Sequence, residues 1–123
     1  VLITLGDAGA FLAPGGLRGD GTATVTRAPA ARVQAIDTTG AGDAFNGALA
    51  AAWAARPDTD PAALLPFAIR FAGLSTERPG AASAMPRREE LDARFPPSAA
   101  SCPLAVIRSA IRVGESARAP AFG

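Results

Sequence analysis

A glycine-rich turn between a short apolar run and a helical pattern constrains the fold more than any other segment of the chain. The sequence DTTGAGD occupies residues 37–43 and follows residues 32–36, RVQAI, a candidate strand. Apolar residues then recur at helical spacing through residues 44–55. A glycine turn that opens a helix leaves backbone N–H groups and the positive end of the helix dipole available to an anion. The sequence therefore predicts an anion-binding turn before this helix.

Further elements are expected on both sides of the turn. The apolar and β-branched runs that predict strands are residues 1–5, as a buried strand, and residues 10–13, 22–26 and 32–36. A second helix is predicted from residue 61 to about residue 75, with Asp60 as its N-cap, and a short charged helix opens near residue 86. Near the end of the chain, a single helical face is suggested by the spacing of Leu104, Ile107, Ala110 and Ile111.

Composition excludes several kinds of chemistry. The chain has 123 residues, which suits one domain at most, and its net charge of +1 gives no electrostatic reason to bind nucleic acid or a membrane surface. It has no His, no Lys and one Cys, so histidine-based catalysis, His-ligated zinc, a Walker A loop and an internal disulfide are excluded. Acid–base chemistry is left to Asp and Glu, and anion binding to Arg, backbone amides and helix ends.

Asp43 stands at the start of the helix, beside the predicted anion site. A carboxylate next to a phosphate is electrostatically unfavourable unless it has a task, such as accepting the proton of an alcohol that attacks the phosphorus. The N–H groups of Gly40 and Gly42 would then stabilise the developing charge. A purely structural turn remains an alternative at this point. A dinucleotide-binding fingerprint fits poorly, because Phe45 stands where the third glycine would be.

The segment of residues 37–50 resembles the C-terminal signature of the ribokinase/PfkB family of carbohydrate kinases along its whole length. Residues 1–9 resemble the family strand and turn that border the nucleotide, and residues 75–90 resemble a loop and helix near the family's C-terminus. The resemblance covers about residues 1–94, as the C-terminal part of a kinase domain. It leaves residues 95–123 as an unassigned tail, open to being disordered or non-native. It implies an α/β fold with a mostly parallel central sheet and helices on both faces.

The same resemblance implies ATP-dependent phosphorylation of a sugar hydroxyl and assigns roles residue by residue. Asp43 matches the catalytic base that faces the acceptor sugar, and the anion hole matches Gly40, Ala41 and Gly42. The family's contacts to ATP fall on Thr4, Gly6, Gly9 and Gly42.

The cofactors implied are ATP, Mg²⁺ and a monovalent cation such as K⁺. The residues that match the monovalent-cation site are Asp37, Thr39, Ser75, Arg78 and Gly80. Two positions depart from the family: Ile69 stands where an Asn often faces the nucleotide, and Ala84 stands where a Ser often supplies a cation oxygen. We therefore expect activation by K⁺ to be weakened.

Two other functions remain open: a kinase for a nucleoside or another small alcohol, and an inactive remnant of a kinase. The family's sugar-binding region and its Mg²⁺-associated motif would lie upstream of Val1, so we expect the chain alone to transfer no phosphate. The resemblance implies a cytoplasmic protein that binds ATP and a small sugar, with no nucleic-acid or membrane partner, and it leaves a homodimer open.

Overall fold

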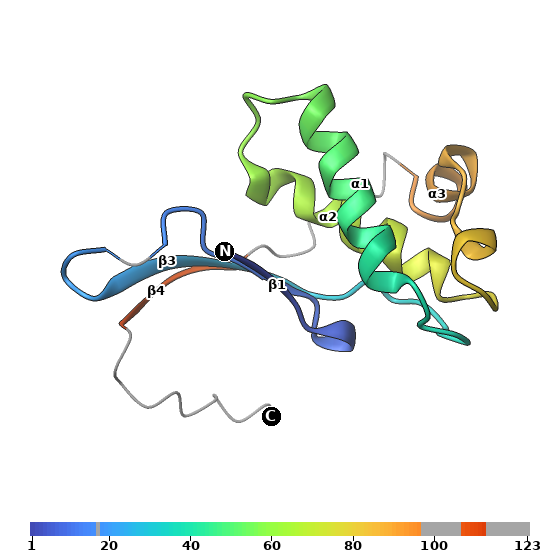
Figure 1. Cartoon of the computed structure of the whole chain (residues 1–123), viewed down its shortest axis with the longest axis horizontal. Coiled ribbons are helices and arrows are strands. Elements are labelled where there is room, and N and C mark those ends of the chain that lie inside the picture. Colours follow the sequence, from blue (N-terminus) through green and yellow to red (C-terminus); the bar gives the residue numbers. More distant parts are fainter. Residues whose placement is uncertain (17, 97–106, 113–123) are drawn as a thin grey trace.

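The computed structural model describes residues 1–16, 18–96 and 107–112, and it places a twisted sheet beside a group of helices (Figure 1). The strands are β1 (Leu2–Thr4), β2 (Ala10–Leu12), β3 (Thr22–Ala28) and β4 (Ile107–Arg112). The helices are α1 (Ala41–Ala55), α2 (Pro61–Ser75) and α3 (Arg88–Arg94), with short 3-10 turns η1 (Gly6–Ala8) and η2 (Ala82–Ala84). The three helices predicted between residues 44 and 94 and the first three predicted strands are confirmed. No helix in these ranges is long and apolar enough to cross a membrane.

The sheet has the order β1-β2-β3-β4, and every neighbouring pair is antiparallel. In the register, Ile3 lies opposite Phe11, which lies opposite Arg27 on the next strand. The connections between the first three strands are short, whereas a parallel pair needs a crossover of about a dozen residues or more. The chain combines a sheet with helices, which confirms the α/β class. The described strands do not form the mostly parallel sheet that was expected, because every neighbouring pair is antiparallel.

One face of this sheet packs against α2, which in turn packs against α1. Ala10, Leu12 and Ala28 from the strands join one buried cluster with residues of both helices. The helix residues of this cluster are Phe45, Ala48, Leu49, Ala52, Ala62, Leu64, Leu65, Ala68 and Ile69. The many alanines let α1 and α2 pack closely on each other. This packing holds the first turn of α1 near the end of β1.

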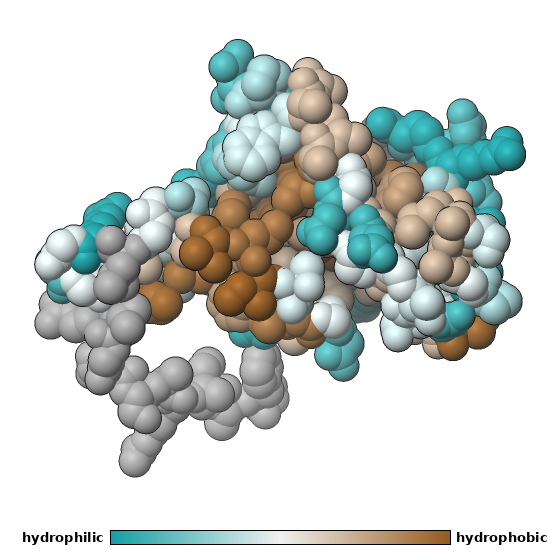
Figure 2. All heavy atoms as spheres, viewed as in Figure 1, coloured by the Kyte–Doolittle hydropathy of each residue, from teal (hydrophilic) through white to brown (hydrophobic). Residues whose placement is uncertain are grey.

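The opposite face of the sheet is largely open, and the expectation that residues 1–5 form a buried strand is wrong. Ile3 is 52% exposed, and Ile107 and Ile111 are also exposed on this face. The guanidinium of Arg27 lies 5.4 Å from the centre of the Phe11 ring. Figure 2 shows apolar surface where β1 lies in Figure 1. No described helix covers this side, which accounts for the exposure.

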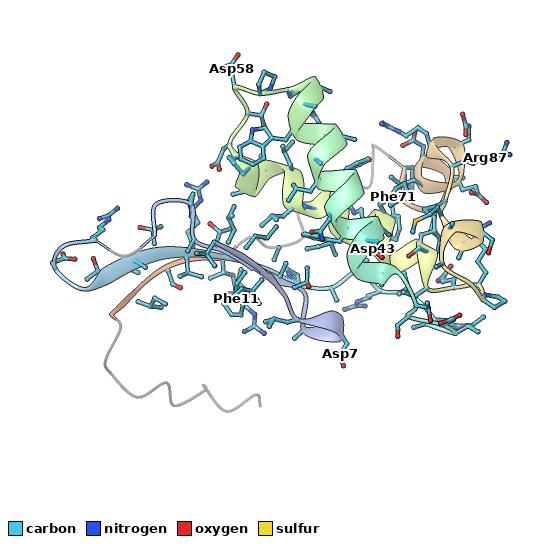
Figure 3. The ribbon with its side chains drawn as sticks, viewed as in Figure 1. Asp7, Phe11, Asp43, Asp58, Phe71 and Arg87 are labelled. Carbon is cyan, nitrogen blue, oxygen red and sulfur yellow. The ribbon has the colours of Figure 1, made fainter. Side chains whose placement is uncertain are left out.

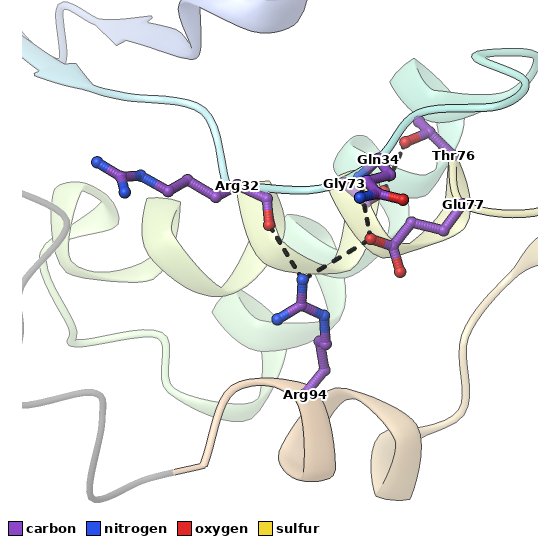
Figure 4. A network of polar contacts seen from close by, with 6 residues as sticks. All are labelled: Arg32, Gln34, Gly73, Thr76, Glu77 and Arg94. Atoms are coloured by element: carbon purple, nitrogen blue, oxygen red, sulfur yellow. Dashed lines mark hydrogen bonds and ion pairs between the residues drawn. The ribbon is translucent and has the colours of Figure 1, made fainter.

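The strand predicted at residues 32–36 is also wrong, because the segment is extended but joins no described strand. Its backbone groups bond to the C-terminal end of α2 instead. The N–H of Gln34 donates to the Glu77 carboxylate over 3.1 Å, and the N–H of Ile36 donates to the Thr76 carbonyl over 2.7 Å. Figure 4 shows this segment running along the helix end. The composition of residues 32–36 does not show whether their backbone bonds to a neighbouring strand or to the end of a helix.

The helical face suggested by Ile107, Ala110 and Ile111 is a further error, because residues 107–112 form β4; Leu104 lies outside the described residues. The edge of β3 offers a row of backbone donors and acceptors that a strand can pair with. Arg108 of β4 also forms an ion pair with Asp60, the N-cap of α2. The division at residue 94 stays a prediction, and residues 97–106 and 113–123 lie outside the described ranges.

Candidate active site

A cavity of about 320 Å³ lies between the end of β1, the segment of residues 30–35, the first turn of α1 and one face of α2. Its size falls at the lower end of the range for small-molecule sites, about 300 to 1,000 Å³. The four residues predicted to contact the nucleotide all line it: Thr4, Gly6, Gly9 and Gly42. The fold thus brings residues 4–9 and Gly42, which are distant in sequence, to the same cavity.

The first turn of α1 is uncapped by any described side chain. Its first N–H groups have no acceptor one turn earlier in the helix, as at every helix start. At α2, by contrast, the Asp60 carboxylate accepts from the N–H of Ala62 over 2.9 Å. At α3, the Glu90 carboxylate accepts from the N–H of Arg87 over 2.6 Å. At the start of α1, the N–H of Ala41 donates to the Thr38 carbonyl over 3.1 Å, whereas no described side chain accepts from Gly42 or Asp43, so these two donors are available to a ligand.

The two glycines of the turn serve different needs. Gly40 has a φ of 76°, and a Cβ there would lie 3.1 Å from the Cβ of Ala81, so the fold itself requires glycine. Gly42 has no protein atom within 4 Å of an added Cβ, and it lines the cavity. A side chain at residue 42 would therefore occupy the space of a ligand rather than collide with the protein.

Asp43 is the third residue of α1 and is exposed to solvent (Figure 3). It follows Gly42 directly but is not among the residues that line the cavity. Its carboxylate is therefore open to a second molecule that approaches the anion-binding turn from outside. This position suits a group that receives a proton from an acceptor molecule.

The Asp37 carboxylate joins the anion-binding turn to the loop after α2. One oxygen accepts from the N–H of Thr39 and the other from the N–H of Gly80, each over 2.9 Å. The hydrogen bond from Gly80, followed by those from Thr39, lowers the pKa of Asp37 to about 2. These contacts bring together three of the residues predicted for a monovalent-cation site.

The side chains of the other two predicted cation residues point elsewhere. Ser75 is buried, and its hydroxyl donates to the Ala72 carbonyl over 2.7 Å. The Arg78 guanidinium forms an ion pair with Glu90 over 3.0 Å. Ser75 and Arg78 can contribute only backbone carbonyls to such a site. The described residues contain no group of three or more His, Cys, Asp or Glu suited to a metal ion.

Sequence reasoning missed the wall of the cavity formed by residues 30–35, together with Asp7, Thr38 and Thr76, which also line it. Asp7 lies within the turn of residues 6–9 that was singled out, and Figure 3 shows it on η1. Its position inside this turn is a signal by which Asp7 could have been predicted to line the cavity. The wall carried no such signal, because its pattern predicts a strand.

The fold and the cavity define an α/β chain with an uncapped, glycine-containing helix start that opens into a ligand-sized space. The model of the pfkB family of carbohydrate kinases matches residues 1–88. The chain belongs to this family.

Three relatives illustrate the similarity. The chain is 47% identical to ribokinase of Bacillus subtilis over 64 residues, which cover 52% of this chain and 21% of that protein. It resembles the crystal structure of ribokinase from Thermotoga maritima with a TM-score of 0.63 and 36% identity, covering 75% of this chain and 28% of that one. Aminoimidazole riboside kinase from Salmonella enterica, solved with aminoimidazole riboside and an ATP analogue, gives a TM-score of 0.64 and 31% identity, covering 77% and 31%. The chain spans about a quarter of the length of these relatives.

Replacing Gly42 by Val should remove anion binding and keep the fold, because the added side chain would fill the cavity. The measurement is displacement of a fluorescent ATP analogue by ATP, together with a thermal melt. Gly47→Val is the matched control: Gly47 lies in the same helix, is exposed and also has open space around it. We expect the affinity for ATP to fall at least tenfold in Gly42→Val and to stay unchanged in Gly47→Val. Equal affinity in both variants would refute the anion site, and unfolding of Gly42→Val alone would make this glycine structural.

The bonds to Asp37 should make stability depend on acid pH. The pKa of this carboxyl is about 2 in the folded chain and near 3.9 in an unfolded one. Its contribution is therefore complete above pH 4 and is lost as the pH falls toward 2. The difference in melting temperature between the wild type and Asp37→Asn should shrink over that interval. A difference that stays constant from pH 5 to pH 2 would contradict the assignment. The same substitution at the exposed Asp58 is the control.

Proposed function

We propose that this chain supplies the nucleotide side and the catalytic base of an ATP-dependent sugar kinase. The observation that carries the proposal is the uncapped start of α1, which opens through Gly42 into the cavity. Phosphates of ATP would bind the free N–H groups of this turn, where the helix dipole favours negative charge. Membership of the pfkB family and the similarity to ribokinases support a sugar as the acceptor.

In the proposed reaction, Asp43 accepts the proton of the acceptor hydroxyl. The hydroxyl oxygen then forms a bond to the γ-phosphorus of ATP, and the bond from that phosphorus to the β–γ bridging oxygen breaks to release ADP. Charge on the transferred phosphoryl group is stabilised by the N–H groups of the turn, which are fixed in place before the reaction. The exposed position of Asp43 beside Gly42 suits this role, because the acceptor must reach it from outside the nucleotide cavity.

The residues present fit Mg²⁺ that arrives on the nucleotide. Mg²⁺ is usually held by substrate phosphates, waters and one or two carboxylates. Asp7 is the acidic residue among those that line the cavity, and the described residues offer no larger acidic cluster. When bound, the ion would neutralise phosphate charge, while the residues of this chain would orient the phosphates and take the proton.

The residues present also fit a weakly held monovalent cation. Asp37 supplies an ionised carboxylate, and its Oδ2, which accepts the N–H of Gly80, keeps a lone pair for a cation. Further oxygens would come from the carbonyls of Thr39, Ser75, Arg78 and Gly80. Ala84 is buried next to this loop and offers no side-chain oxygen. Such a cation would strengthen the positive field at the anion hole.

Asp43→Asn should abolish phosphoryl transfer without weakening nucleotide binding. Turnover can be measured in a chimera in which this chain replaces the matching quarter of Bacillus subtilis ribokinase. Removal of a general base lowers kcat by about 10² to 10⁴. The control is Asp58→Asn, the same change at an exposed site outside the cavity lining. A chimera with Asp43→Asn that keeps a third or more of the parent rate would contradict the assignment.

A riboside acceptor is the second candidate. The observation that favours it is the similarity to the aminoimidazole riboside kinase, whose TM-score of 0.64 equals that of the ribokinase, 0.63, within 0.01, at a lower identity of 31% against 36%. The residues that line the cavity are assigned to the nucleotide, so they do not choose between the two acceptors. Measuring ADP release with free sugars and with ribosides separates the two. No release with any acceptor would favour the inactive remnant.

Activation by K⁺ should be detectable but weak, and it should act on kcat more than on KM. The reason is that Asp37 is the side chain that offers oxygens to the cation, while Ala84 offers none. The test replaces K⁺ by a bulky organic cation in the chimera assay. Ala84→Ser, which adds an oxygen beside the same loop, should strengthen the response. Identical rates in both buffers, for the parent and for Ala84→Ser, would show that no cation binds here.

A further inference from the structure

The wall of the cavity formed by α2 and residues 30–35 offers no free polar side chain. The side chains that line it are aliphatic: Ala30, Ala31, Val33, Ala35, Ile69 and Ala72. Thr76 also lines the cavity, but its hydroxyl donates to the Gly73 carbonyl over 2.7 Å and so completes the end of α2. A ligand that lies against this wall meets apolar surface.

The polar part of the lining lies elsewhere, on Thr4, Asp7, Thr38 and the uncapped start of α1. A nucleotide whose phosphates bind that helix start therefore places its base against the aliphatic wall. The two ends of the ligand meet surfaces of opposite character, so the phosphates bind through polar groups and the base through apolar contact.

The two parts of the aliphatic wall, residues 30–35 and α2, pack directly on each other. A Cβ at Gly73 would lie 3.2 Å from both the Ala31 Cβ and the Val33 Cγ1, so the segment already packs directly on the helix. The Arg94 guanidinium donates to the Arg32 carbonyl over 3.4 Å and lies 3.9 Å from the Glu77 carboxylate (Figure 4). The shape of the wall is thus set before any ligand binds.

Three backbone groups of residues 32–36 are also engaged. The N–H of Gln34 donates to Glu77, the N–H of Ile36 donates to the Thr76 carbonyl, and the Arg32 carbonyl accepts from Arg94. These three bonds point toward α2 and α3. The side chains that line the cavity on this side are aliphatic, so the base of a nucleotide would meet apolar side chains there.

We propose that the cavity selects the base of its nucleotide by shape and apolar contact alone, with Ile69 as the specificity-determining residue, and accepts ATP and GTP nearly equally. Sites that hydrogen-bond a substrate group can reject an analogue by about 10⁴-fold or more, whereas apolar pockets discriminate by only about 10- to 200-fold. Adenine and guanine differ in their polar edges and share the same bicyclic shape. Pyrimidines bury less apolar area and bind more weakly. This inference rests on the proposed nucleotide site.

The direct test is competition for a ribose-labelled fluorescent ATP analogue on this chain, with ATP, GTP, CTP and UTP as Mg²⁺ complexes. We expect ATP and GTP within a factor of five of each other, and the pyrimidine nucleotides at least tenfold weaker than either. A difference of more than fivefold between ATP and GTP, or pyrimidines that bind as well as purines, would overturn the inference and leave the nucleotide site standing. No displacement by any triphosphate would overturn both.

Ile69→Val and Ile69→Thr form a matched pair, because Val and Thr have the same shape and differ by a hydroxyl. Ile69→Val should weaken the binding of ATP and of GTP by the same factor, a few-fold, and keep the ratio of the two affinities. Thr should change that ratio by at least threefold, since it adds a group that can bond to one base edge. Ile36→Val is the control, because Ile36 is 71% exposed and does not line the cavity. A ratio that shifts as much in Ile69→Val as in Ile69→Thr would refute recognition by shape.

Discussion

The hydrogen bonds of the Asp37 carboxylate hold the candidate site together. They tie the turn that opens α1 to the N–H of Gly80, in the loop that leaves α2. The start of α1 has no side-chain cap of its own, so the N–H groups of Gly42 and Asp43 stay available. The same carboxylate is the ionised group around which a cation would bind. Asp37 thus fixes the shape of the turn at the anion site and places a negative charge beside it.

Packing of α1 on α2 sets the remaining geometry. Small residues on α1, such as Ala44 and Ala48, bring the two helices close, and Leu64 and Leu65 of α2 are fully buried in the resulting core. The segment of residues 30–36 then lies along α2 because Glu77 accepts the N–H of Gln34 and Thr76 accepts the N–H of Ile36. The cavity is what remains between this segment, the two helices and the end of β1. Its polar and apolar ends result from that arrangement.

Local patterns predicted much of this chain. Helical spacing, the Asp60 cap and the glycine turn predicted α1 and α2. The resemblance to the family, not a local pattern, singled out Thr4, Gly6 and Gly9, and these three residues do line one cavity with Gly42. Features that depend on a partner distant in sequence could not be predicted in the same way. The run at residues 32–36 has a strand's composition, but its hydrogen-bond partners lie about 40 residues further on. The pairing of β4 with β3 and the exposure of β1 likewise depend on which surfaces meet in space.

The central claim is that phosphate binds the uncapped start of α1, and amide NMR tests it most directly. On titration with ATP, the backbone N–H resonances of Gly42 and Asp43 should shift saturably, and inorganic triphosphate should move the same two signals. The N–H of Ala62, which Asp60 already caps at the start of α2, should not move. Gly42 and Asp43 resonances that stay in place at saturating ATP, or that shift no more than that of Ala62, would contradict the account.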